Sequence, residues 1–297
     1  MRKIISILIV TFMLLASSCS AATTSDSAGK LKIVTTTFPV YDFVRAVAGE
    51  SADITMLIAP SADVHSYDPT PSDIIKINSA DLFVCIGGES DVWIDKLVKS
   101  SSMNIIRLIE YCSELLTDSH GDYEEHVWLL PKNSIDCIDI ICTSLCAVSP
   151  RNADLYVQNK TNYIDQIAQM DNDMNEMMQN AKRNRIIIAD RFPFIYLTDH
   201  LNIKYDAAIE GCDGHGDASV SAIASLINIV KNESIPFIYY IEFSNQAAAK
   251  TVSAETGAEM LLLHSCQNVT KSEFDNGVTY VSLMNQNIKN LEKGLCR

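Results

Sequence analysis

The sequence predicts an α/β protein with two parallel-sheet βα lobes joined by one long, rigid helix. Short apolar runs alternate with amphipathic stretches in both halves of the chain, as strands alternate with helices in a parallel sheet. Between these regions, residues 151–183 contain neither Gly nor Pro, and apolar residues recur there from Leu155 to Met178. A helix of about 30 residues is roughly 45 Å long, so we expect it to act as a stiff connection.

The first 29 residues are typical of an exported lipoprotein. Residues 1–3 are basic at Arg2 and Lys3, residues 4–15 are almost entirely apolar, and small residues lead to Cys19. The apolar run is shorter than the roughly 20 residues that span a bilayer, so we expect a signal peptide at residues 1–18. The small residues before Cys19 resemble a lipobox, with an ordinary secretory signal as the alternative. We expect a lipid on Cys19 to anchor the chain at the outer face of the bacterial cell membrane, through a flexible tether at residues 19–29.

The strands and helices of each lobe follow from the same alternation. We expect the first lobe at residues 30–149, the linking helix at 150–183 and the second lobe at 184–297. In the first lobe, the pattern predicts a helix at 38–49 and strands at 32–37, 54–58, 80–86 and 104–108. In the second lobe, it predicts strands at 186–189, 205–209, 236–241 and 259–263, and helices at 193–200, 218–231, 245–256 and 280–295.

Charge and cysteine usage exclude several classes of protein. The formal net charge is −14, and it becomes −16 when Arg2 and Lys3 leave with the signal peptide. Such an acidic chain disfavours nucleic acid and anionic membrane surfaces as partners. Eight cysteines follow Cys19, and none forms a CxxC pair, so a cysteine-only zinc site is not indicated. A disulfide between Cys212 and Cys266, which both follow predicted strands, is a hypothesis.

Four side chains that bind metals in proteins follow predicted strands. His65 lies in a proline-rich loop, His126 follows an acidic loop, and Asp190 and His264 each end an apolar strand. Ligands of parallel α/β lobes bind beyond the carboxyl ends of the strands. Each residue alone is explained as well by a structural role, but four of them at strand ends in both lobes predict a ligand site. Glu242, after the strand at 236–241, is a reserve ligand or a carboxylate that orients an imidazole.

Two motifs resemble those of a known family. Residues 65–73 read His-Ser-Tyr-Asp-Pro-Thr-Pro-Ser-Asp, similar to the His-x-Tyr-Glu-Pro-Thr-Pro-Ser-Asp signature of the zinc/manganese solute-binding lipoproteins of metal ABC importers, with Asp68 in place of Glu. Residues 126–129 read His-Val-Trp-Leu, which resembles that family's second metal-ligand motif. The likeness covers nearly the whole mature chain. It implies two four-stranded lobes joined by a rigid helix, with one metal in the cleft between them.

The sequence departs from the family pattern at two ligand positions. The family's third ligand, a His or Glu, corresponds to Arg191, and the adjacent Asp190 is the candidate replacement. The fourth ligand is usually Asp, and His264 stands there. The resemblance therefore implies a set of His65, His126, Asp190 and His264, which suits Zn²⁺. Mn²⁺ prefers more oxygen ligands and is the alternative.

These features together favour metal capture over catalysis. We expect an extracytoplasmic, monomeric protein that takes up the ion without covalent chemistry and delivers it to an ABC permease and its ATPase. The main rival is a secreted zinc metallohydrolase with Glu242 as its base, although the sequence contains no HExxH, GxSxG or Walker A motif. A siderophore- or cobalamin-binding protein would need a wide aromatic or basic cleft. His120 and the loop at 211–217 are accessory metal candidates, for which we favour solvated loops.

Overall fold

The computed structural model describes residues 29–98, 104–117, 121–211 and 217–297. The chain divides into a unit at residues 1–30 and a second unit at residues 31–297, which contains all the strands and helices given below. The signal peptide, Cys19, His120 and Cys212 lie outside the described residues. None of the helices in the described ranges combines the length and the apolar character that a membrane crossing requires.

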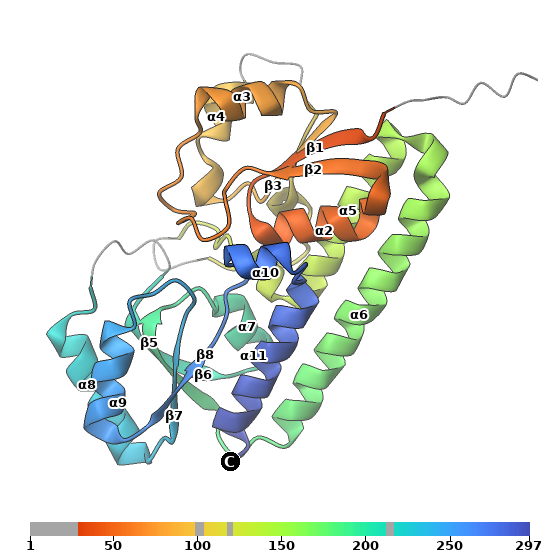
Figure 1. The fold of residues 1–297 in the computed structure, drawn as a ribbon. Helices are drawn as coiled ribbons and strands as arrows, with labels where there is room; N and C mark the ends of the chain where they lie inside the picture. Colours follow the sequence, from red (N-terminus) through yellow and green to blue (C-terminus); the bar gives the residue numbers. More distant parts are fainter. Residues whose placement is uncertain (1–28, 99–103, 118–120, 212–216) are drawn as a thin grey trace, which may run out of the picture. The chain divides into compact units, whose positions relative to one another are not determined.

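The first lobe is built on a parallel sheet in the order β2-β1-β3-β4 (Figure 1). Its strands are β1 (Leu31–Thr35), β2 (Ala52–Met56), β3 (Leu82–Cys85) and β4 (Ile105–Arg107). Every residue of β3 is buried, and its side chains alternate between two apolar clusters. Leu82 and Val84 join the main core with α2 (Phe38–Ala48), whereas Phe83 and Cys85 pack with Ile77. Helices therefore cover both faces of the sheet, which explains the continuous apolar run of this strand.

Two of the further helices of the first lobe, α3 (Pro71–Asn78) and α5 (Pro131–Val148), begin with a proline in the first turn, which is a sequence signal for a helix start. The lobe also contains α4 (Ile94–Val98) and the 3-10 turns η1 (Gly49–Ser51), η2 (Glu89–Asp91), η3 (Leu108–Tyr111), η4 (Val127–Leu129) and η5 (Pro150–Asn152). At α3 the Thr70 side chain accepts from the Asp73 amide, and the Asp73 carboxylate accepts from the Thr70 amide. This capping box lies within the Pro-Thr-Pro-Ser-Asp motif, so that half of the motif starts a helix.

The long helix α6 (Ala153–Gln179) connects the two lobes. Its 27 residues span about 40 Å. Its buried side chains recur every three, four or seven residues, and they are Tyr156, Tyr163, Ile167, Met170, Met174 and Met177. Along this stripe α6 packs against α2 and α5 of the first lobe and against α11 (Tyr280–Leu295) of the second (Figure 1). The prediction of a long connecting helix is confirmed.

The second lobe repeats the strand order of the first. Its parallel sheet runs β6-β5-β7-β8, with β5 (Arg185–Arg191), β6 (Lys204–Ile209), β7 (Phe237–Tyr240) and β8 (Glu259–Leu262). Its helices are α7 (Ile195–His200), α8 (Val220–Glu233), α9 (Ala247–Thr256), α10 (Lys271–Asp275) and α11. Two parallel-sheet α/β lobes with a long helix between them confirm the predicted fold class. The carboxyl ends of both sheets supply the side chains considered next.

Asp42 joins three helices in the interior. It is buried on α2, and its carboxylate accepts hydrogen bonds from the Tyr163 hydroxyl of α6 and from the Tyr280 amide at the start of α11. Arg45 forms an ion pair with Asp42 and donates to the Val278 carbonyl at 2.6 Å. A single carboxylate therefore connects the first lobe, the long helix and the last helix of the second lobe.

Candidate metal site

Three donor side chains meet beyond the strands of the first lobe. His65 lies in the loop after β2, and Glu125 and His126 immediately precede η4. One donor atom of each lies within 4.8 Å of the other two, and within the described residues this is the one group of three or more metal-binding side chains so spaced. The ligand atoms of a tetrahedral zinc ion lie about 3.4 Å apart, given bond lengths of about 2.1 Å. Small side-chain shifts therefore suffice to place all three donors on one ion.

Neighbouring acceptors fix the orientation of both imidazoles. His126 Nδ1 contacts the Glu124 carboxylate, which only accepts, so this nitrogen carries the proton and Nε2 holds the lone pair. The Ser90 hydroxyl donates to Glu125 Oε1 at 2.6 Å, so its oxygen is the acceptor for His65 Nδ1 at 3.3 Å. Both histidines thus present Nε2 for coordination, the arrangement that metal-binding histidines usually have.

A tight turn after β3 holds Glu125 in place. The Ser90 amide donates to Glu125 Oε2 at 2.8 Å, and a Cβ on Gly88 would lie only 2.3 Å from Glu125 Cβ. The turn is closed by Asp91, which accepts from the Gly87 amide at 2.9 Å. Burial raises the pKa of Asp91 to about 7, and the nearby Glu125 carboxylate adds to that rise. Glycine at position 88 is therefore required by the close approach of the turn to the donor.

Trp128 ties the His126 segment to the second lobe. Its ring lies 5.1 Å from the His126 ring, and its Nε1–H donates to the Ser265 carbonyl at 2.7 Å. The Tyr280 hydroxyl donates to the Trp128 carbonyl at 2.5 Å. The loop that carries His65 is held in a similar way, because the Asn268 side chain donates to Ala59 and Ala62 carbonyls. Hydrogen bonds from the second lobe therefore hold the segments that carry both histidines.

A cavity of about 180 Å³ extends from His65 to the second lobe. His65, Arg191 and Glu242 all line it, so the structure brings Glu242 to the same space as one of the histidines. The Glu242 carboxylate accepts from the Ser265 amide at 2.9 Å and from the Ser265 hydroxyl. These bonds engage both carboxylate oxygens and fix the group at the cavity wall, and Oε1 also lies 3.5 Å from His264 Nδ1.

Asp190 faces a different space. It lines a neighbouring cavity of about 620 Å³, together with Asp63 and Arg191. Its two carboxylate oxygens accept from the Arg191 amide at 3.0 Å and the Ile241 amide at 3.5 Å. The carboxylate therefore caps backbone groups where β5 ends, and it does not line the cavity that His65 lines.

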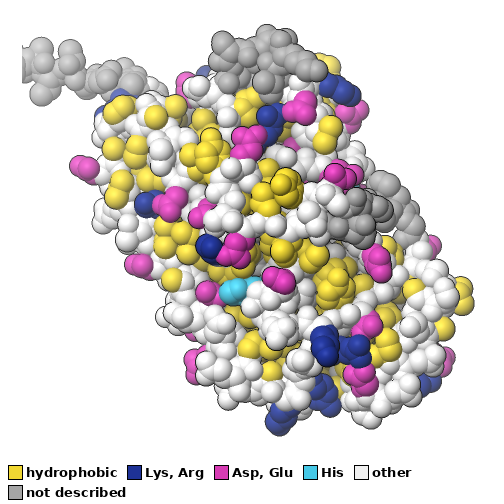
Figure 2. All heavy atoms as spheres, turned by 180° about the vertical axis from the view of Figure 1, so that it is seen from behind, with side chains coloured by type: hydrophobic (Ala, Val, Ile, Leu, Met, Phe, Trp, Pro, Cys, Tyr) yellow, Lys and Arg dark blue, Asp and Glu magenta, His cyan; other side chains and the backbone are white. Residues whose placement is uncertain are grey.

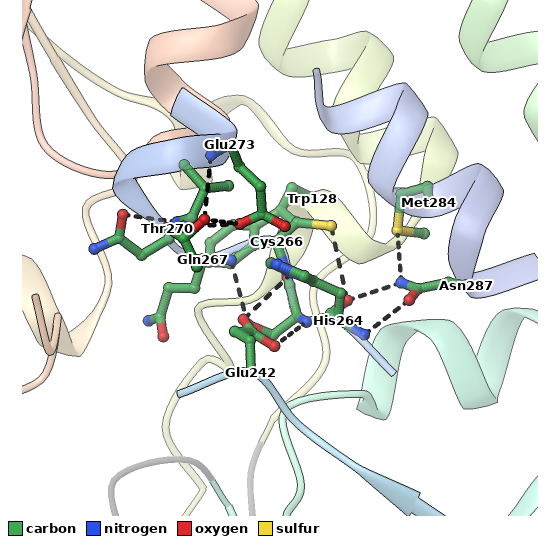
Figure 3. A network of polar contacts seen from close by, with 12 residues as sticks. Trp128, Glu242, His264, Cys266, Gln267, Thr270, Glu273, Met284 and Asn287 are labelled. Carbon is green, nitrogen blue, oxygen red and sulfur yellow. Dashed lines mark hydrogen bonds and ion pairs between the residues drawn. The ribbon is translucent and has the colours of Figure 1, made fainter. Parts of the chain in front are cut away.

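His264 is engaged within the second lobe, as Figure 3 shows. Its Nδ1 accepts the Cys266 amide at 2.9 Å, because the left-handed backbone of Cys266 (φ 63°) turns that N–H back toward the ring. A neutral imidazole that accepts at Nδ1 carries its proton on Nε2 and has no second lone pair for a metal. The backbone of His264 exchanges two hydrogen bonds with the Asn287 side chain. His264 lines neither of the two cavities described above.

The sequence interpretation named His65 and His126 but passed over Glu125. The available signal was its position directly before His126, at the end of an acidic loop. Glu124 and Glu125 are equivalent by sequence, yet the first supports an imidazole and the second faces both histidines. The Cys212–Cys266 disulfide remains a prediction because Cys212 lies outside the described residues; Cys266 is buried.

One face of the molecule can be inspected for gatherings of acidic side chains in Figure 2. On the face shown in Figure 2, acidic side chains are dispersed among apolar and neutral ones rather than gathered into one patch. A net charge of −14 attracts cations in general, but it does not by itself position one. The specific geometry therefore lies in the group of His65, Glu125 and His126, of which Glu125 and His126 are buried and His65 is partly exposed.

Comparison with known proteins identifies relatives of the same architecture. The chain is 29% identical, over 309 residues, to the zinc-binding lipoprotein AdcA of Streptococcus pneumoniae, and the match covers 99% of this chain and 61% of that protein. It thus spans about three fifths of the length of that relative. It is 28% identical to the high-affinity zinc uptake system protein ZnuA of Bacillus subtilis, covering 97% of this chain and 96% of the relative.

Solved structures agree with these matches. The zinc-bound ZnuA-like domain of Streptococcus pneumoniae AdcA superimposes with a TM-score of 0.78 at 30% identity, covering 91% of this chain and all of that domain. The metal-dependent lipoprotein YcdH of Bacillus subtilis gives a TM-score of 0.80 at 25% identity, covering 90% of this chain and all of that one. The family model described as the periplasmic component A of the zinc-uptake complex matches residues 33–294. The chain therefore belongs to this family of extracytoplasmic zinc-uptake components, which are metal-binding solute-binding proteins and not enzymes.

Proposed function

We propose that the chain captures Zn²⁺ outside the cytoplasm on His65, Glu125 and His126 and delivers it to an ABC permease. The observation that carries this proposal is the convergence of the three donors within 4.8 Å, with both imidazoles oriented by hydrogen-bonded neighbours. Two nitrogens and one carboxylate oxygen are ligands that zinc accepts readily. Zinc is also the metal in the names of the relatives and in the related bound structure.

Glu242 is our candidate for the fourth ligand. It lines the same cavity as His65 but comes from the second lobe. A metal held by donors from both lobes would be released when the lobes separate slightly at a permease, whereas the three donors of the first lobe would keep their geometry. A site with two carboxylates is richer in oxygen than the one implied by the sequence, so Mn²⁺ is the competitor to test against Zn²⁺.

The location of the protein completes the proposal. Membership of a periplasmic zinc-uptake family supports action outside the cytoplasm and a permease as partner. The basic and apolar N-terminus that leads to Cys19 supports a lipid anchor. In bacteria that express the full chain, Cys19→Ala should move the protein from the membrane fraction to the soluble fraction. Retention of the variant in the membrane fraction would contradict the anchor.

Zinc binding is tested by titrating the metal-stripped full-length chain in competition with a chromophoric chelator, with Mn²⁺ as the competing ion. We expect one zinc per chain, and we expect His126→Ala to weaken affinity by more than the roughly 10–100-fold effect of losing a supporting residue. His200→Ala is the matched control, because His200 pairs with Asp171 on α6, away from the site. Equal affinity in His126→Ala and wild type would refute the proposed site.

A further inference from the structure

Two cysteines, one on each side in sequence of the segment that carries Glu125 and His126, lie close together in the structure. The sulfur atoms of Cys112 and Cys137 are 3.8 Å apart. Cys112 directly follows η3 and is partly exposed, whereas Cys137 is fully buried on α5. The function proposed above uses neither thiol. The proposed metal binding therefore does not explain why these two thiols lie together.

The distance between the two sulfur atoms is short enough for a covalent bond to form after a small movement. A disulfide brings its sulfur atoms to about 2.05 Å, so the two atoms must approach by roughly 1.8 Å. Cys112 lies in an irregular segment that can supply this movement. By contrast, Cys142 and Cys146 are four residues apart on α5, where Cβ atoms are held about 5–6 Å from each other. That spacing exceeds the Cβ separation of about 3.5–4.5 Å that a disulfide needs.

Hydrogen bonds already align the Cys112 segment along α5. The Ser113 amide and hydroxyl donate to the Asp136 carboxylate at 2.8 Å and 2.6 Å. The Asn133 side chain accepts from the Glu114 amide and donates to the Glu114 carbonyl. The segment and the helix are therefore already in register for a crosslink between their two sulfur atoms.

We propose that Cys112 and Cys137 form a disulfide when the chain meets an oxidising thiol-disulfide partner outside the cytoplasm. The ring closed by this bond contains residues 113–136, and these include Glu124, Glu125 and His126. The crosslink fastens the start of that loop to the helix that follows it. The Tyr196 hydroxyl already joins the two sides of the same loop, by accepting from the Leu116 amide and donating to the Glu124 carbonyl.

The chemistry is an exchange with a protein or small-molecule disulfide. The Cys112 sulfur, as thiolate, attacks one sulfur of the oxidant, and the other sulfur leaves as a thiolate. Cys137 then loses its proton, and its sulfur attacks Cys112 Sγ and expels the second thiol. Two thiols are oxidised, and one disulfide is reduced to two thiols. The hydrogen bond with Cys112, together with burial, raises the pKa of Cys137, so the partly exposed Cys112 reacts first.

The test is to treat the zinc-free full-length chain with glutathione disulfide, alkylate the remaining thiols after unfolding, and map the linked peptides by mass spectrometry. We expect a Cys112–Cys137 peptide pair that disappears on reduction, and a melting temperature higher by about 5 °C or more in the oxidised chain. Recovery of both cysteines in alkylated form would overturn the proposal, as would linkage of either one mainly to another cysteine.

Variants separate the two steps. Cys137→Ala should lose the linked peptide and the rise in melting temperature, and it should retain glutathione on Cys112. If Cys137→Ala does not fold, Cys112→Ala serves in its place, because that side chain is only partly buried. Cys146→Ala is the matched control and should keep the crosslink. A stable glutathione adduct on Cys112 of the wild-type chain would contradict a paired role. Because zinc is absent, these results do not depend on the proposed metal site.

Discussion

The Glu124 carboxylate determines the orientation and the tautomer of the His126 imidazole. The Glu124 carboxylate contacts Nδ1 and also accepts the His126 amide at 3.1 Å. A carboxylate in this position fixes the proton on Nδ1 and increases the basicity of Nε2. Ser90 has the equivalent role for His65, with a weaker acceptor. The two histidines are thus supported by groups of different strength.

We therefore expect Glu124→Gln to weaken zinc binding without abolishing it. The amide oxygen still accepts from Nδ1, but the negative charge is lost, so the affinity should fall by roughly 10–100-fold. Glu110→Gln is the control, because Glu110 lies outside the group of donors. Competition titration measures both. An unchanged affinity in Glu124→Gln would show that Glu124 does not support the ligand.

Of the three side chains that the structure brings together, the two histidines were singled out in the sequence and the carboxylate was not. Histidine is rare in this chain, so one in a stiff loop and one beside Trp128 were conspicuous. Glu125 has two acidic neighbours within three residues, and only the approach of Gly88 and Ser90 distinguishes it. The direction of the His264 ring depends on the left-handed turn at Cys266, which a cysteine does not indicate in a sequence.

The turn from Gly87 to Asp91 links the proposed metal site to the stability of the first lobe. A buried carboxyl group with a raised pKa is stabler as the neutral acid. Asp91 has a pKa of about 7 in the folded chain, above the ordinary value of 3.8. Its contribution to stability is therefore complete below about pH 4 and is lost as the pH rises through 7.

We accordingly expect the free energy of unfolding of the metal-free chain to decline from pH 4 to pH 7 through this residue, by up to about 1.4 kcal/mol per pH unit. Asp91→Asn should lack this component, so the variant gains stability relative to wild type as the pH rises. Urea unfolding at several pH values measures the difference. Asp53→Asn, at an exposed carboxylate on β2, is the control. A stability difference between Asp91→Asn and wild type that does not vary with pH would contradict the account.

At the level of elements, the strands were predicted within a few residues, whereas four helices were missed: α3, α5 and the short helices α4 and α10. The sequence analysis assigned no helix to α3 or α5, although Pro71 and Pro131 stand at their first turns. In α3 the Pro-rich motif was interpreted only as a stiff loop. The apolar pattern of α5 includes cysteines, which behave as small apolar side chains when buried, and it was not assigned to a helix. The prolines that mark the start of these two helices were present in the sequence, but they were not considered together with the spacing of the apolar residues that follow.

In the molecule as a whole, the lobes share one buried anchor at Asp42. This carboxylate is 1% exposed and binds groups from α2, α6 and α11. Removal of one partner from a buried charged network leaves the others without compensation. The long helix therefore depends on Asp42 as well as on its apolar stripe for its place between the lobes.

We expect Asp42→Ala to lower the free energy of unfolding by about 3–5 kcal/mol. The control is Asp139→Ala, because Asp139 forms an exposed ion pair with Lys160 and should cost less than about 1 kcal/mol. Chemical denaturation measures both values. A loss at Asp42 as small as the loss at Asp139 would show that this anchor contributes little.

The fold class itself followed from strand alternation and the uninterrupted helix, but this anchor joins positions more than 100 residues apart and has no local signature.

The central claim is that zinc binds to the group of His65, Glu125 and His126, and it is tested most directly by comparing Glu125→Gln with His264→Asn. The asparagine oxygen replaces Nδ1 as acceptor for the Cys266 amide, so His264→Asn preserves the local turn. Zinc titration of the full-length variants should show a loss of at least about 100-fold for Glu125→Gln and an affinity near that of wild type for His264→Asn. The opposite result would contradict the account and would support the ligand set that the family resemblance implies.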